Sequence, residues 1–134
     1  MSNFPVTVFH NPACGTSRTV LGLLDTAGYK PQVVEYLKAG WTRPQLEDLL
    51  SRMGAKPRDI LRDKGSPAAE LGLLDPAATD AQILDAMVEH PILVNRPIVV
   101  TPNGVRLARP AERVFEVLEE GRSTSAPENP PPSS

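Results

Sequence analysis

The chain has 134 residues, 40% of them hydrophobic, so it can bury the core of one compact domain but is too short for two ordinary ones. Its formal charge of -2 and its pI of about 5.7 do not favour binding to nucleic acid or to an anionic membrane surface. No apolar run approaches the roughly 20 residues of a membrane span, and the first residues lack the features of a secretory signal. We therefore expect a cytoplasmic protein that contacts neither membranes nor nucleic acid.

The first residues predict a strand, a helix and a second strand. A β-branched and aromatic run predicts a strand over residues 5–10, and the turn formers of residues 11–15 end it. Apolar side chains at helical spacing predict a helix over residues 17–28, and residues 31–36 predict the next strand. This β-α-β order implies parallel pairing of the two strands, with Cys14 just before the helix.

The middle of the chain is predicted to be helical. Thr42 and Gln45 have the spacing of a capping box ahead of an apolar periodic segment. The same pattern begins a helix predicted over residues 79–89, and a further helix is predicted over residues 57–62. Together these helices would form an insertion.

The last third predicts a β-hairpin and a closing helix. Two strand-like runs within residues 98–108 flank an Asn-Gly pair, which tolerates the positive φ of tight turns. Pro110 suits the start of the last helix. We predict one domain over residues 1–120 and a disordered, Pro- and Ser-rich tail over residues 121–134.

Cys14 is the only cysteine in the chain. A single thiol cannot form a disulfide within the chain, which fits a reducing compartment, so any disulfide must join another molecule. One cysteine and two separated histidines do not supply the three or four clustered ligands that zinc requires, so we expect no bound metal.

The order of elements, β-α-β, helices and β-β-α, is that of the thioredoxin-like α/β fold, a mixed four-stranded sheet flanked by helices, here with a helical insertion. In that fold a reactive cysteine lies at the N-terminus of the first helix. Unpaired N–H groups and the helix dipole favour the thiolate there, so Cys14 is predicted to be a nucleophile rather than an inert core thiol. Ser17 can donate a hydrogen bond to its sulfur. His10 would either lower the pKa of the thiol when charged or hydrogen-bond the loop.

Two segments resemble the glutaredoxin-coupled arsenate reductases. Residues 10–18, HNPACGTSR, are similar to the active-site segment of that family, and residues 90–100, HPILVNRPIVV, are similar to its second signature. Residues 60–62 and 106–110 fall where the family has functional arginines, so the resemblance spans roughly residues 4–120. Beside the nucleophile, the first segment contains the supporting residues Asn11, Gly15, Thr16 and Ser17.

The resemblance implies an oxidoreductase that reduces arsenate to arsenite in arsenic detoxification. Arg62, Arg96 and Arg109 would bind the oxyanion and stabilise the charge that builds on its oxygens, as charge-assisted donors can. Pro97 would be the cis-proline that opens the third core strand, and it would aim Arg96 at the site.

The resemblance also implies the co-substrate. The Cys14 thiolate would displace an oxygen from arsenate, glutathione would add to the adduct, and arsenite would leave. The remaining mixed disulfide of Cys14 and glutathione would be reduced by glutaredoxin, because the chain has no second thiol. No tightly bound cofactor is expected.

Three other classes of protein fit the sequence less well. An arsenate reductase with a low-molecular-weight phosphatase loop needs an arginine six residues after its cysteine, where this chain has Val20. A cluster-binding monothiol glutaredoxin has Cys-Gly-Phe-Ser, but residues 14–17 lack the aromatic and the three arginines would be unexplained. A non-catalytic Spx-like regulator shares the fold but typically carries Cys-x-x-Cys, and Ser17 argues against that disulfide switch, though not against a binding role.

Overall fold

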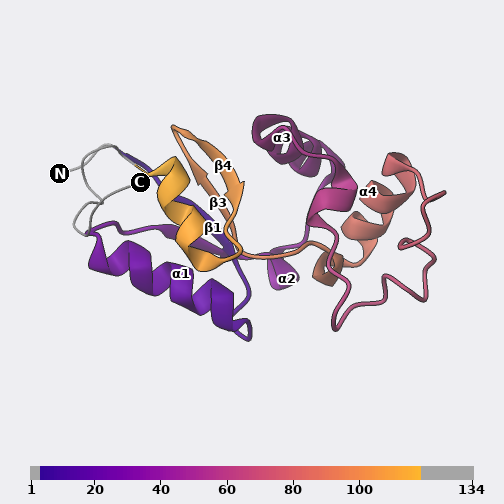
Figure 1. The fold of residues 1–134 in the computed structure, drawn as a ribbon, viewed down its shortest axis with the longest axis horizontal. Helices are drawn as coiled ribbons and strands as arrows, with labels where there is room; N and C mark the ends of the chain where they lie inside the picture. The colour runs from indigo at the N-terminus through magenta and orange to yellow at the C-terminus, as the bar shows by residue number, and fades with distance from the viewer. Residues whose placement is uncertain (1–3, 119–134) are drawn as a thin grey trace. The chain divides into compact units, whose positions relative to one another are not determined.

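The computed structural model describes residues 4–118, which form two compact units (Figure 1). The first unit takes the chain up to Val34 and again from Arg96, and the second is Glu35–Asn95. The predicted tail over residues 121–134 and the predicted domain end at residue 120 lie outside the described residues, so both stay predictions. Within the described part, no helix is long and apolar enough to cross a membrane.

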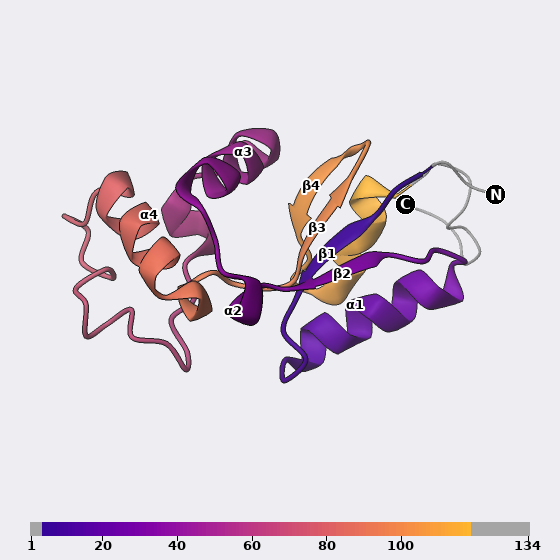
Figure 2. The same cartoon turned by 180° about the vertical axis from the view of Figure 1, so that it is seen from behind.

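The first unit is built on a mixed four-stranded sheet with the order β2-β1-β3-β4 (Figure 2). β1 (Thr7–His10) pairs antiparallel with β3 (Ile98–Thr101), and β3 pairs antiparallel with β4 (Gly104–Leu107). β2 (Gln32–Glu35) lies beside β1 at the other edge. The predicted thioredoxin-like fold is confirmed by this sheet.

The β3–β4 hairpin confirms the turn predicted from the Asn-Gly pair. Gly104 has a φ of 144°, a region that side chains rarely adopt, so the turn favours glycine here. The hairpin also holds the end of the described chain, because the Thr101 hydroxyl donates to the Val117 carbonyl at 2.5 Å. Asn103 Nδ2 donates to the Leu118 carbonyl at 3.0 Å.

Two helices, α1 (Gly15–Thr26) and η3 (Ala111–Val117), contact each other and the sheet (Figure 1). The predicted last helix is a 3-10 helix rather than an α-helix. Its buried residues recur every third position, which places them on one face of a helix with three residues per turn. The core between helices and sheet includes Val8, Val20, Leu24, Val99, Val114 and Val117.

The second unit is helical, as predicted. Its elements are α2 (Tyr36–Ala39), α3 (Arg43–Met53), η1 (Pro57–Ile60), α4 (Asp80–Glu89) and η2 (Pro91–Leu93). α4 contacts α3, η1 and η2, and α2 contacts η2, so the five elements share one interior.

Both predicted capping boxes are present in the second unit. The Thr42 hydroxyl accepts from the Gln45 N–H at 3.2 Å, and the Thr79 hydroxyl accepts from the Gln82 N–H at 3.1 Å. In each box the glutamine side chain accepts from the threonine N–H in return. His90 is the C-cap residue of α4.

The prediction of a helix over residues 57–62 is wrong in both the length and the type of the helix. η1 is a single 3-10 turn, and Leu61 is already extended and forms an antiparallel bridge with Val94. The Arg62 N–H donates to the Leu93 carbonyl at 2.7 Å. This pairing joins segments that are far apart in the chain, so local propensity does not reveal it.

Candidate active site

Cys14 is the N-cap residue of α1, with an extended backbone (φ -94°, ψ 122°). The Arg18 N–H donates to the Cys14 carbonyl at 3.0 Å and closes the first turn. Gly15 and Thr16 are the first helical residues, so the helix begins two residues earlier than predicted. The thiol therefore lies at the positive end of the helix dipole, and it is 8% exposed.

The loop before α1 is held by buried hydrogen bonds to Ser17. The Ser17 hydroxyl accepts from the Asn11 N–H at 3.1 Å and lies 2.8 Å from His10 Nδ1. The Asn11 carbonyl accepts from the Cys14 N–H at 2.9 Å, and its side-chain oxygen accepts from the Ala13 N–H. His10 therefore contacts Ser17 of α1, the residue that also holds the loop, and both predicted roles of His10 stay predictions.

Two of the three predicted arginines lie at the sulfur. Arg109 Nη1 donates to Cys14 Sγ at 3.6 Å and to the Arg96 carbonyl at 2.9 Å. Arg96, which is 9% exposed, also acts on the thiol as a hydrogen-bond donor and a nearby charge. The Arg96–Pro97 peptide bond is cis, and the Pro97 carbonyl accepts from the Ala108 N–H at 2.9 Å.

The surroundings of Cys14 lower the pKa of its thiol to about 7. Burial is the largest influence and raises this pKa, but the Ser17 N–H and the Arg96 and Arg109 side chains together lower it further. Ser17 therefore acts on the sulfur through its backbone N–H, whereas its hydroxyl contacts His10 and Asn11. A substantial fraction of the thiol is thus the nucleophilic thiolate at neutral pH.

We expect alkylation of Cys14 by iodoacetamide to rise with pH through a midpoint of about 7. The pKa of Cys14 is lower in the folded protein than in the unfolded chain, so ionisation of the thiol stabilises the fold. This stabilisation is complete at a pH above the unfolded pKa, and it is lost as the pH falls through about 7. The rate is measured by intact mass on the folded protein and, as the control, in denaturant. Equal midpoints in the two states would contradict the assignment.

The third predicted arginine, Arg62, lies in the second unit. Its Nε donates to the Lys64 carbonyl at 3.0 Å, and its Nη1 lies 3.4 Å from the Asn95 side-chain oxygen. These contacts hold Arg62 beside the residue that precedes Arg96 in the chain. Its action on the oxyanion stays a prediction.

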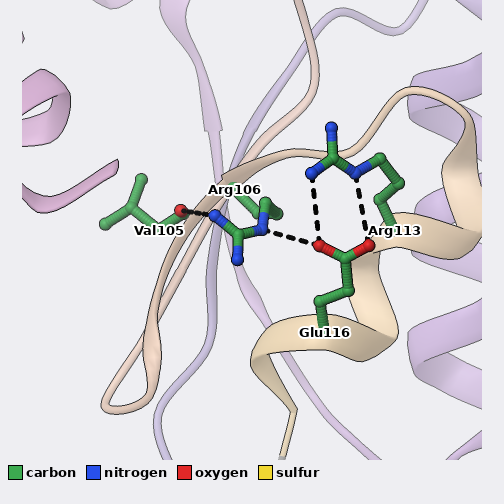
Figure 3. Close-up of polar contacts among 4 residues, drawn as sticks. All are labelled: Val105, Arg106, Arg113 and Glu116. Carbon is green, nitrogen blue, oxygen red and sulfur yellow. Dashed lines mark hydrogen bonds and ion pairs between the residues drawn. The ribbon is translucent and has the colours of Figure 1, made fainter. Parts of the chain in front are cut away.

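An ion cluster joins the two elements on either side of Arg109 (Figure 3). Glu116 accepts from Arg106 Nε at 2.8 Å and from the Nε and Nη2 of Arg113, both at 3.3 Å. Hydrogen bonding, first from Arg113, lowers the pKa of Glu116. Arg106 lies on β4 and the other two lie on η3, so the carboxylate ties together both ends of the segment that carries Arg109.

Sequence reasoning did not single out Glu116. The three-residue spacing of Arg113 and Glu116 on a helix is a local signal for an ion pair. The contact with Arg106 has no such signal, because a strand and a helix bring these side chains together. Among residues 4–118, no group of three or more His, Cys, Asp or Glu side chains could hold a metal ion.

Comparison with known proteins gives a consistent result. The ArsC family model matches residues 9–117. The arsenate reductase ArsI1 of Synechocystis sp. is 60% identical over 119 residues, which cover 89% of this chain and 83% of that protein. The arsenate reductase of Escherichia coli K12 is 47% identical over 122 residues, which cover 91% and 85%. The structure of an arsenate reductase from Vibrio cholerae has a TM-score of 0.82 at 38% identity, and it covers 87% of this chain and 100% of that one.

Proposed function

The chain belongs to the ArsC family, and from this membership we propose that it reduces arsenate to arsenite with glutathione as co-substrate and glutaredoxin as the recycling reductase. One observation carries the proposal. The Cys14 thiol has a pKa of about 7, and the Arg109 guanidinium lies 3.6 Å from its sulfur. A nucleophile and a cationic oxyanion donor therefore lie together, as attack on an arsenate ion requires.

In the first step the Cys14 thiolate attacks the arsenic atom. An S–As bond forms, and one arsenate oxygen leaves as water after protonation. Charge builds on the remaining oxygens, and Arg96 and Arg109 stabilise it with charge-assisted hydrogen bonds. Such donors act more strongly at a partly desolvated site than in water, which fits the low exposure of Arg96. Arg62 is proposed as a third donor on the strength of the family resemblance.

In the second step a glutathione thiolate attacks the Cys14 sulfur of the adduct. An S–S bond forms and the S–As bond breaks, and its electron pair passes to arsenic, which is reduced from As(V) to As(III) and leaves as arsenite. Two thiols become one disulfide, which balances the two-electron reduction. The chain has one cysteine and cannot resolve this mixed disulfide, so glutaredoxin with a second glutathione must reduce it. Glutathione is kept reduced in the cytoplasm, where we place the enzyme.

The test is a coupled assay with glutathione, glutaredoxin, glutathione reductase and NADPH. We expect NADPH oxidation to require arsenate and to stop when either glutathione or glutaredoxin is left out. Phosphate is the control, because it has the same shape and charge but is not reduced by thiols. A rate that does not depend on arsenate, or no rate with every component present, would contradict the proposal. Capture of RNA polymerase without arsenate turnover would favour the Spx-like alternative.

A further inference from the structure

Arg18 lies beside the nucleophile on the exposed side of the active-site loop. It lies in the first turn of α1, where its backbone N–H donates to the Cys14 carbonyl at 3.0 Å. Its Nη1 donates to the Pro12 carbonyl at 2.8 Å. Its Nη2 lies 3.8 Å from the position that a Cβ on Gly15 would take. The guanidinium therefore reaches back over the loop that carries the reactive sulfur.

Apart from the three arginines predicted to bind the oxyanion, Arg18 differs from the other arginines of residues 4–118 in its partners. Four of them form ion pairs with carboxylates: Arg43, Arg52, Arg106 and Arg113. Arg58 donates to three backbone carbonyls, at 2.8 to 3.3 Å. In the described chain Arg18 has no carboxylate partner and one side-chain hydrogen bond, from Nη1. Its Nε and Nη2 donors thus keep their capacity for an anionic ligand.

The proposed reaction brings such an anion to this edge of the site. Glutathione must place its sulfur against the Cys14 sulfur, and the tripeptide carries two carboxylates. Arg96 is buried next to the thiol, whereas Arg18, Pro12 and Ala13 are exposed. An arriving thiol therefore meets the Arg18 guanidinium at the surface of the loop.

We propose that Arg18 binds a carboxylate of glutathione and so makes the enzyme prefer an anionic thiol co-substrate. This inference rests on the proposed function and names a specificity residue for its second step. The bond to Pro12 restrains the long Arg18 side chain before the ligand arrives, which lowers the entropy lost on binding. The planar guanidinium can also offer a carboxylate two parallel donors.

The test is the single-turnover formation of the mixed disulfide on Cys14, followed by intact mass in the presence of arsenate. Arg18→Gln keeps a donor for the Pro12 carbonyl but removes the charge. We expect its half-saturating glutathione concentration to rise about three- to tenfold, with the maximal rate and the arsenate dependence within about twofold of wild type. With 2-mercaptoethanol, which has no carboxylate, the variant and the wild type should react alike. Arg18→Lys should recover most of the preference for glutathione.

The matched control is Arg52→Gln, which removes an exposed, ion-paired arginine from α3 and should leave both thiols unaffected. If Arg18→Gln slows both thiols equally, Arg18 supports the loop only and the inference is overturned. If it changes neither thiol while wild type reacts, the Arg18 assignment fails and the proposed function stands. If wild type forms no arsenate-dependent disulfide with any thiol, the proposed function fails and the inference fails with it.

Discussion

Cys14→Ser should abolish arsenate-dependent NADPH oxidation, with a loss of about a thousandfold or more in kcat. The Cys14 thiol has a pKa of about 7 and is substantially ionised at neutral pH, whereas a serine hydroxyl stays protonated there. The described donors around this position are chiefly the Ser17 N–H and two guanidinium groups. They do not lower the pKa of a serine hydroxyl enough to ionise it at neutral pH. No second cysteine exists in the chain to take over the attack.

The serine variant is a clean test because it should fold normally. Serine is a favoured N-cap residue, so α1 should start at the same place, and circular dichroism and the thermal midpoint should match wild type. Intact mass after incubation with arsenate and glutathione should show one added glutathione on wild type and none on the variant. Turnover by a folded serine variant at a rate near wild type would exclude Cys14 as the nucleophile.

Arg109→Ala should lower kcat/KM for arsenate by about 30- to 1,000-fold, which corresponds to roughly 2 to 4 kcal/mol of transition-state stabilisation. Two effects combine in this loss. The guanidinium helps to hold the pKa of Cys14 down, so its removal should raise that pKa and reduce the thiolate at neutral pH. It also donates at the place where charge builds on the arsenate oxygens.

The two effects of Arg109 are separable by pH. Iodoacetamide alkylation reports only the thiolate, so its midpoint should shift upward in Arg109→Ala. At a pH high enough to ionise the thiol in both proteins, the remaining deficit in turnover measures the lost oxyanion donor. Arg52→Ala is the control, because it removes an equal charge from α3, where Arg52 pairs with Asp48 rather than with the sulfur. Wild-type kcat/KM in Arg109→Ala would remove Arg109 from the site.

Local sequence signals predicted the elements that depend on neighbours in the chain. The capping boxes at Thr42 and Thr79 join residues that are three positions apart, and the tight turn at Gly104 depends on the backbone freedom of that one residue. The residue types at these positions therefore predict the structure directly. The order of these elements led to the thioredoxin-like fold, and the fold, the family and the enzyme class are confirmed. The roles of glutathione and glutaredoxin stay predictions.

Segments whose structure depends on distant partners were predicted less well. Leu61 lies in a segment that the sequence predicts to be helical, yet it is extended and forms an antiparallel bridge with Val94. The last helix is a 3-10 helix because Ala111, Val114 and Val117 must all face the core at a spacing of three. In both places, tertiary packing outweighs helix propensity, which is worth well under about 1 kcal/mol per residue for ordinary residues.

The sequence by itself determined that Cys14 is the only thiol, that it sits in a loop before a helix, and that its disulfide must involve another molecule. Only the tertiary structure decided how reactive that thiol is. Arg109 lies 95 positions away in the chain and yet donates to the sulfur, and the pKa of about 7 depends on it, on Arg96 and on burial. Electrostatic interactions depend on distance and desolvation through space, and folding alone sets both quantities.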